Sequence, residues 1–417
     1  MAPIQSNTRN GRLSANRKMV AVTMLAGVVV GAAAGRLRKP AAIDGEQVQP
    51  PPMIDWKRVR SIAISMNRGL ALTAAERARV TDGYRQLVEQ CLPIVTAYTG
   101  IELPDAPERT FAVDRVDWIE ANIDGFKRMF EPFEGLNPAS DGAPSTAGVL
   151  LSTANRAVMS TEVGVLLGYM ARKVLGQYDL ALLGREPVDS GKLYYVEPNI
   201  RAVEQAMHLP KADFRMWLAL HEVTHAFEFE GVPWLKPHFN GLIESYFAYL
   251  RQDAEQLRQG FSAMRAMVNR AREQRSAELS WIEAVMTPEQ RGIFNQMQAA
   301  MCMVEGYSNH VMNAVGKDLL PKFDRISKTF ERRQQERTPV DKLFVRLTGL
   351  DLKYEQYRLG EQFINKIADE RGHDVARRIW DNAASLPTME EIRNPQLWLD
   401  RVVDASAPNG RIVGSIS

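Results

Sequence analysis

Residues 217–227 read WLALHEVTHAF, and this segment is the starting point for predicting the fold. Apolar residues recur in it every three to four positions, which is the periodicity of an α-helix. Asp213, just upstream, is a residue type that caps helix starts, whereas Gly231 and Pro233 downstream are helix breakers. The sequence therefore predicts a helix that Asp213 caps and that ends near Gly231.

Two histidines and a glutamate on this helix form the pattern H-E-x-x-H. His221 and His225 are four residues apart, so their imidazoles are expected one turn apart on the same face. Such a pair suits Zn²⁺, which imidazole nitrogens bind at about 2.0–2.1 Å. Glu222 lies beside that face, where it is placed to take a proton from a metal-bound water rather than to bind the metal. The pattern predicts a Zn²⁺ cofactor held by His221 and His225, with Glu222 as the catalytic general base.

A third ligand is needed, because catalytic zinc sites usually have three protein ligands and one open position. Glu244 follows His225 by 19 residues on a predicted helix, and an antiparallel return could bring it back to the metal. Glu305 is a lone carboxylate in a long apolar helix, where an unpaired buried charge is costly. Gly306 beside it would let another helix approach closely. This argument favours Glu305, and Glu244 stays the alternative.

Other residues near these positions are weaker candidates for a role in catalysis. Tyr307 and His310 could stabilise an oxyanion, although such residues more often serve packing. The segment 193–196 has the character of an edge strand, which in a peptide hydrolase could bind an extended substrate by strand addition.

Helical periodicity dominates the chain from residue 55 onward. The predicted helical segments are 80–95, 157–175, 212–229, 239–257, 293–315 and 357–367. Strand signals are few and short, at 110–113, 147–151 and 193–196. We therefore predict a mainly α fold with few short strands, in one large domain over residues 54–405. A split into subdomains around residue 150 stays the alternative, because Pro138, Gly142, Pro144 and Gly148 give that stretch the character of a loop.

Composition narrows the class of protein. The chain has 417 residues, of which 45% are hydrophobic and 24% charged, and this is typical of a globular protein. Lys and Arg number 52 against 50 Asp and Glu, so no basic field favours nucleic acid as a partner. Two cysteines, Cys91 and Cys302, are too few for a disulfide framework or a cysteine-based zinc cluster.

The N-terminal residues form three segments outside the predicted domain. Residues 1–18 are a basic tail, residues 19–35 an uncharged apolar segment, and residues 36–53 a proline-rich linker. The apolar segment is short for a membrane span, which needs about 20 residues. A membrane anchor, a cleaved secretory signal and a helix of a soluble protein all stay open. The cellular location of the protein is therefore left open between membrane-associated and cytoplasmic. At the other end of the chain, residues 406–417 are expected to be a flexible tail.

Further motifs in the chain resemble those of a known family. They occur, in order, at Val113-Asp114-Arg115, Trp118, Asn122, Glu197-Pro198-Asn199-Ile200, Trp217, His221-Glu222-Val223-Thr224-His225, Val232-Pro233-Trp234-Leu235, Glu305-Gly306, Val311-Met312, Gln356-Tyr357, Gly360-Glu361, Phe363, Leu386-Pro387-Thr388, Glu391-Ile392, Pro395 and Trp398. Together they resemble a zincin-like family of zinc metallopeptidases that is often labelled as associated with coenzyme F-420 biosynthesis. The resemblance covers roughly residues 54–405 and is most specific at the H-E-x-x-H helix.

The resemblance implies a zincin-like domain, a function and a set of site residues. His221 and His225 resemble the zinc-binding histidines of the family and Glu222 its catalytic glutamate. Glu305 matches a recurring Glu-Gly motif, which supports it as the third ligand. The implied protein is a zinc metallopeptidase that hydrolyses a peptide or another amide; the alternative is a non-catalytic zinc-binding or scaffold protein with a zincin fold. Membrane association would rest on residues 19–35, and the coenzyme label implies no substrate.

Overall fold

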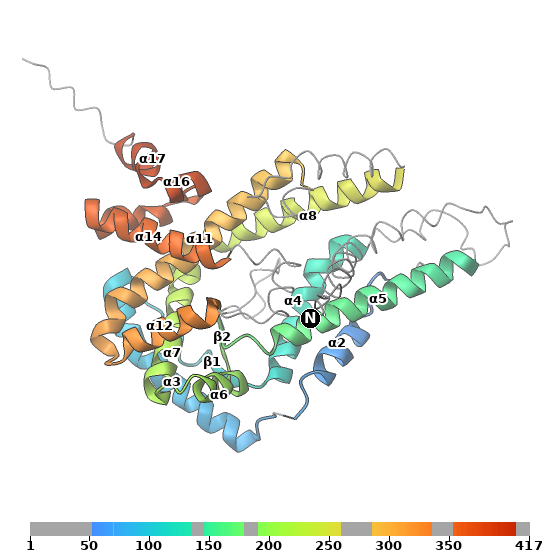
Figure 1. Cartoon of the computed structure of the whole chain (residues 1–417), viewed down its shortest axis with the longest axis horizontal. Coiled ribbons are helices and arrows are strands. Elements are labelled where there is room, and N and C mark those ends of the chain that lie inside the picture. The colour runs from blue at the N-terminus through green and yellow to red at the C-terminus, as the bar shows by residue number, and fades with distance from the viewer. Residues whose placement is uncertain are drawn as a thin grey trace, which may run out of the picture. The chain divides into compact units, whose positions relative to one another are not determined.

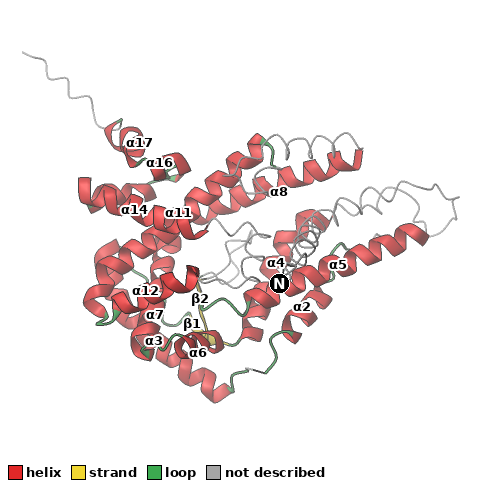
Figure 2. Ribbon diagram, viewed as in Figure 1, coloured by secondary structure: helices red, strands yellow, loops and turns green. Residues whose placement is uncertain are grey.

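The computed structural model describes residues 52–69, 71–134, 146–178, 191–259, 286–335 and 353–405. Helices make up most of these residues, and three short strands form one small sheet (Figure 2). This arrangement confirms the predicted fold class, which is mainly α with few short strands. By its internal contacts the chain divides into two compact units.

The first unit comprises Met1–Met66, Met129–Gly168 and Phe247–Val285. Its described part includes α2 (Trp56–Ser65) and most of α5 (Thr146–Met170) (Figure 1). The strand predicted at 147–151 is wrong, because this segment belongs to α5. A short apolar run fits either period, and here its alanine and leucine residues favour the helix.

Small residues bring α2 and α5 close together. A Cβ atom on Gly164 would lie 2.9 Å from the Cβ of Ile62, a distance that a larger residue would not tolerate. The backbone N–H of Asp55 at the start of α2 donates a hydrogen bond to Ser160 Oγ at 2.8 Å. These contacts fix the pairing of the two helices.

The second unit comprises Asn67–Arg128, Tyr169–Tyr246 and Met286–Ser417, and its core is built on four long helices. These are α3 (Ala74–Thr99), α7 (Lys211–Gly231), α11 (Pro288–Leu319) and α14 (Lys353–Arg371). In Figure 1, α3 packs on α7, α7 on α11, and α11 along α14. The helices predicted at 80–95, 212–229, 293–315 and 357–367 all lie within these four.

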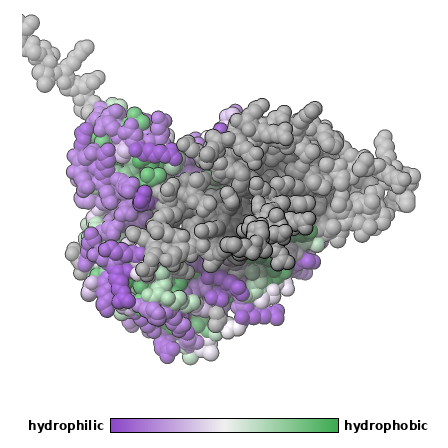
Figure 3. Space-filling view, viewed as in Figure 1, coloured by the Kyte–Doolittle hydropathy of each residue, from purple (hydrophilic) through white to green (hydrophobic). Residues whose placement is uncertain are grey.

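Further elements complete the described structure. They are α4 (Arg115–Glu134), α6 (Glu197–Ala206), α8 (Leu235–Gln259), α12 (Phe323–Gln335), α15 (His373–Arg377), η4 (Arg378–Trp380), η5 (Ala383–Ser385), α16 (Met389–Arg393), α17 (Pro395–Trp398) and η6 (Leu399–Asp404). In the view of Figure 3, hydrophilic residues predominate on the described surface of the second unit. Many of the apolar side chains of that unit are buried in its core instead.

Helix α11 approaches α14 very closely, as glycine at position 306 led us to expect. A Cβ atom on Gly306 would lie 2.4 Å from the backbone carbonyl carbon of Gly360, and one on Gly360 would lie 2.1 Å from the carbonyl oxygen of Cys302. Only residues without a Cβ allow this contact. The two glycines therefore fix how α11 is seated on α14.

The small sheet has the strand order β1-β3-β2. Strand β3 (Leu193–Val196) pairs in parallel with β1 (Thr110–Val113) and antiparallel with β2 (Gly176–Tyr178). The prediction that 193–196 is an edge strand is wrong, because β3 is the central strand. Its apolar residues Leu193, Tyr195 and Val196 are fully buried, and such burial is typical of a strand with neighbours on both sides.

Helix α7 begins earlier than predicted. Its N-cap is Pro210, with no side-chain hydrogen bond, and Asp213 lies within the first turn instead of capping it. Proline presets a backbone angle suited to a helix start, and an acidic residue in the first turn still favours the helix dipole. The helix ends at Gly231, as predicted.

The predicted basic tail, the apolar segment 19–35, most of the linker and the tail 406–417 lie outside the described residues. Among the helices that the structure does describe, none has the combination of length and hydrophobicity that a membrane span requires. The domain boundaries at 54 and 405 stay predictions.

Candidate metal centre

Helix α7 carries His221 and His225 one turn apart, with their rings directed at one point. Their Nε2 atoms are 3.2 Å apart, and the two ring planes are inclined by 75°. Two nitrogens bound to one tetrahedral zinc ion at about 2.05 Å would lie about 3.3 Å apart, by the geometry of a tetrahedron. The spacing of the two Nε2 atoms therefore fits a shared metal ion.

Helix α11 brings Glu305 to the same point. Its Oε2 atom lies 4.0 Å from His225 Nε2, and one ligand atom from each of His221, His225 and Glu305 lies within 4.8 Å of the other two. Within the described part of the chain, this is the group of histidine and acidic side chains that fits a metal ion. Glu244, the alternative third ligand, is exposed on α8 and is not part of the group.

The other ring nitrogen of each histidine is held by a buried side chain. His225 Nδ1 lies 2.8 Å from Glu228 Oε2, and His221 Nδ1 lies 3.1 Å from Ser308 Oγ. Glu228 is 2% exposed and Ser308 fully buried. Because these contacts engage Nδ1 of each ring, Nε2 remains for a metal. Residues around metal ligands commonly orient metal-binding histidines through the second ring nitrogen in this way. Met312 Sδ also approaches His221 Nδ1, at 3.2 Å.

The two histidines have opposite pKa shifts. Burial, and then the nearby His225, lower the pKa of His221 well below its usual value, so this ring stays neutral. Burial also lowers the pKa of His225, but its hydrogen bond to Glu228 and the nearby carboxylates outweigh this effect and raise it to about 9. Burial raises the pKa of Glu228 to about 7, against the opposing effect of its hydrogen bond to His225. A metal ion at this point would replace the proton on His225.

The carboxylate of Glu222 lies against strand β2, and its charge contributes to the raised pKa of His225. Glu222 is 5% exposed, and a Cβ atom on Gly176 would lie 2.4 Å from its Oε1 atom. The backbone of β2 thus lies directly against the Glu222 carboxylate, which only glycine permits. The position of β2 therefore decides where this carboxylate can lie.

Strand β2 is itself fixed by buried polar contacts with α4. Trp118 Nε1 donates to Gln177 Oε1 at 2.5 Å, and Gln177 Nε2 donates to Asn122 Oδ1 at 3.1 Å. Trp118 and Asn122 belong to the motifs on which the family resemblance rests. Their contacts therefore connect those motifs to strand β2, whose Gly176 lies against Glu222.

Helix α7 is anchored at its N-terminal half by Glu197, which is 1% exposed. This carboxylate accepts hydrogen bonds from Arg215 of α7 at 2.8 Å, Arg201 of α6 at 2.6 Å and Tyr84 of α3 at 3.0 Å. A buried carboxylate with three donors is fully compensated. The motif that begins at Glu197 therefore ties three helices together and holds the histidine-bearing helix in place.

Tyr307 and His310, the weaker candidates for stabilising an oxyanion, differ in their contacts. His310 is engaged at both ring nitrogens, with Tyr98 Oη at 2.6 Å and Asn365 Oδ1 at 2.5 Å. Tyr307 is 5% exposed and has no hydrogen bond to another described residue. The hydroxyl of Tyr307 therefore has bonding capacity left, whereas the ring of His310 does not.

Sequence reasoning missed Glu228, Ser308 and Gly176. Glu228 follows His225 by three residues and Ser308 follows Glu305 by three, so helical periodicity could have placed both near the metal ligands. No local signal marks Gly176, because its position depends on the pairing of β2 with β3.

Comparison with known proteins gives a consistent assignment. A model of the zincin-like metallopeptidase family matches residues 54–399. The chain is also similar to a solved structure from Chloroflexus aurantiacus, described as a proposed hydrolase with a novel fold, with 38% identity and a TM-score of 0.63. That alignment covers 84% of this chain and 98% of the other. No curated protein matches the chain.

Proposed function

This chain belongs to the zincin-like metallopeptidase family, and from that premise we propose that it is a zinc-dependent hydrolase that cleaves a peptide or another amide. The observation that carries the proposal is the convergence of two Nε2 atoms, 3.2 Å apart, with the Glu305 carboxylate beside them. The family implies a metal, and these three donors are of the types that zinc prefers.

His221, His225 and Glu305 are the proposed ligands. When bound there, zinc would supply a Lewis acid that polarises the scissile carbonyl and makes water more acidic. The side chains of His225 and Glu305 are 12% and 21% exposed, so the ligand cluster is accessible from solvent. An accessible position beside three ligands is typical of a catalytic site, whereas structural zinc sites are usually closed by four protein ligands.

Glu222 is the proposed general base. It follows His221 directly on α7 and is held against Gly176, so its carboxylate has a defined position. In the proposed reaction Glu222 accepts a proton from the attacking water and donates it to the leaving nitrogen. Glu228 and Ser308 hold the two imidazoles at Nδ1 and so keep both Nε2 lone pairs directed at the metal position.

The test compares the natural chain with a Glu222→Gln variant. Both are loaded with zinc and incubated with a broad peptide library, and cleavage is followed by mass spectrometry. We expect one zinc per chain in both proteins and a fall in turnover of about 100-fold or more in the variant, since general-base catalysis contributes roughly 10²–10⁴-fold.

Two results would count against this function. Full activity of the Glu222→Gln variant would refute the role of Glu222. Stoichiometric zinc without cleavage of any peptide or simple amide would instead support the alternative, a non-catalytic zinc-binding or scaffold protein.

A further inference from the structure

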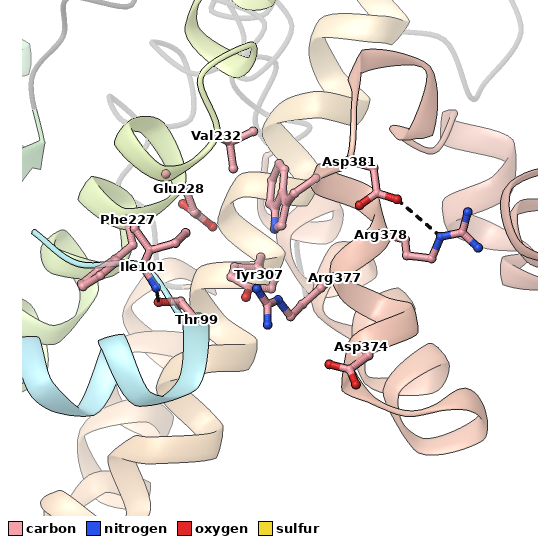
Figure 4. Close-up of a pocket in the computed structure, with 12 residues that line it drawn as sticks. Thr99, Ile101, Phe227, Glu228, Val232, Tyr307, Asp374, Arg377, Arg378 and Asp381 are labelled. Atoms are coloured by element: carbon pink, nitrogen blue, oxygen red, sulfur yellow. Dashed lines mark hydrogen bonds and ion pairs between the residues drawn. The ribbon is translucent and has the colours of Figure 1, made fainter.

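A pocket of about 370 Å³ lies at the C-terminal end of α7, beside the metal centre (Figure 4). Its walls include Phe227 and Glu228 of α7, Tyr307 of α11, and Arg377 and Trp380 of the segment that follows α14. This volume is large enough for one amino-acid side chain.

The pocket adjoins the proposed zinc ligands through two of its wall residues. Glu228 accepts a hydrogen bond from His225, and Tyr307 follows Glu305 by two residues on α11. A group bound in the pocket would thus lie close to the proposed metal position, as a subsite beside the scissile bond requires.

Two hydrogen-bond donors that line this pocket have no partner among the described residues. The hydroxyl of Tyr307, which is 5% exposed, makes no hydrogen bond there. Arg377 is exposed and has no ion pair with a described residue, and its guanidinium extends toward Tyr307 (Figure 4). A buried hydroxyl without a partner is costly, so a ligand that accepts hydrogen bonds from both groups would be stabilised here.

Two of the three acidic residues that line the pocket are less able to contact a ligand. Glu228 has one oxygen on His225, and its other oxygen has almost no accessible surface. Asp381 is paired with Arg378 at 3.4 Å, whereas the third acidic residue, Asp374, is exposed in the first turn of α15. Arg377 is the cationic group that has no ion pair with a described residue and that extends toward Tyr307 (Figure 4).

We propose that this pocket is a specificity subsite that binds a carboxylate of the substrate, with Arg377 as the charged contact and Tyr307 as a further donor. The proposal rests on the hydrolase function proposed above. The carboxylate can belong to an aspartate or glutamate side chain beside the cleaved bond, or to the free C-terminus of a peptide. Guanidinium groups suit both, because they match the planar geometry of a carboxylate.

The test uses the zinc-loaded full chain and matched pairs of peptides. One set replaces glutamate by glutamine at each position around the cleaved bond, and a second set replaces the C-terminal acid by an amide. We expect about a 10- to 100-fold higher kcat/KM for the acid in one of the two sets, which is the effect of a hydrogen bond to a charged group. The set that responds identifies the source of the carboxylate.

Two neighbouring arginines give a matched pair of variants. Arg377→Ala should abolish the preference for the acid, so that the acidic and the neutral peptide of each pair have kcat/KM values within about twofold of one another. Arg378→Ala is the control, because Arg378 also lines the pocket but its guanidinium is paired with Asp381 (Figure 4). We expect that control to keep the full preference.

A binding measurement keeps the pocket testable without turnover. Three compounds are titrated against the zinc-loaded chain by calorimetry: N-acetylglutamate α-amide with a side-chain carboxylate, N-acetylglutamine with an α-carboxylate, and N-acetylglutamine α-amide with neither. We expect one of the two acids to bind at least tenfold more tightly than the neutral compound, with the difference lost in Arg377→Ala. Equal binding of all three compounds, or a preference that survives Arg377→Ala, would overturn the proposed subsite. Failure of the whole hydrolase assignment would look different. In that case no peptide would be cleaved, but the preference for the carboxylate in the binding measurement would remain.

Discussion

Replacing Glu228 by Gln perturbs the proposed metal centre without touching a ligand. The carboxylate of Glu228 lies 2.8 Å from His225 Nδ1 and is 2% exposed, so this hydrogen bond is short, charge-assisted and shielded from water. Glutamine has nearly the same shape and still offers one oxygen to the ring. The substitution therefore removes the charge and leaves the packing of α7 in place.

The expected loss is in zinc affinity rather than in folding. Outer residues that orient a metal-binding histidine typically contribute 10- to 100-fold to affinity, which corresponds to about 1.4–2.8 kcal/mol. In the metal-free protein the substitution also removes the burial cost of a carboxylate whose Oε1 atom has no partner among the described residues. The free energy of unfolding of the metal-free variant should therefore stay within about 1 kcal/mol of the natural value.

Glu230→Gln is the matched control on the same helix. Glu230 lies two residues further along and pairs with Arg109 through two contacts, at 2.8 and 3.0 Å, without contacting a histidine. We expect this control to lose at most about 1 kcal/mol of stability, because the pair is partly exposed, and to bind zinc normally.

Competition with a chelator of known affinity gives the zinc dissociation constant, and urea unfolding of the metal-free proteins gives stability. The visible spectrum of the Co²⁺-loaded proteins adds a direct report on ligand geometry, and it should change in Glu228→Gln alone. Unchanged zinc affinity and an unchanged Co²⁺ spectrum in Glu228→Gln would refute the idea that Glu228 positions His225.

Four further outcomes follow from the geometry and from the raised pKa of His225. Gly176→Ala would place a Cβ atom 2.4 Å from Glu222 Oε1, so turnover should fall at least tenfold while zinc content, measured by mass spectrometry, stays at one per chain. Gly306→Ala would force α11 away from Gly360, and chemical unfolding should show a loss of about 1–3 kcal/mol, whereas a neutral result would contradict the close helix contact. Since the pKa of His225 is raised to about 9, the metal-free protein holds a proton there below that pH, and zinc affinity should rise by up to about tenfold per pH unit up to pH 9. In the metal-free protein the same raised pKa stabilises the fold fully below pH 6.5, and this contribution should disappear as the pH rises through 9, in urea unfolding measured across that range.

The helix that carries the histidines was predictable because every cue for it is local. Apolar periodicity predicts α7, and the four-residue spacing of His221 and His225 places both rings on one face. The choice of Glu305 over Glu244 also rested on a local property, the isolation of one carboxylate in an apolar helix. The structure places Glu305 beside His225 and leaves Glu244 exposed.

Features that depend on tertiary pairing were beyond the sequence. The segment 193–196 was predicted to be an edge strand, yet β3 is central, because β2 pairs with one side of it and β1, which lies far upstream in the sequence, pairs with the other. The contact of Gly176 with Glu222 arises only once β2 has paired with β3. The pocket at Arg377 is formed by four separate segments, so no local pattern announces it.

The most direct test of the central claim is the zinc content of the purified full chain and of three single variants. His225→Ala and Glu305→Gln remove one proposed ligand each, and Glu244→Gln serves as the control for the rejected position. Elemental analysis after dialysis should give one zinc per chain in the natural protein and in Glu244→Gln, and far less than one in the other two. A natural chain without zinc, or full zinc content in Glu305→Gln, would contradict the metal centre proposed for this protein.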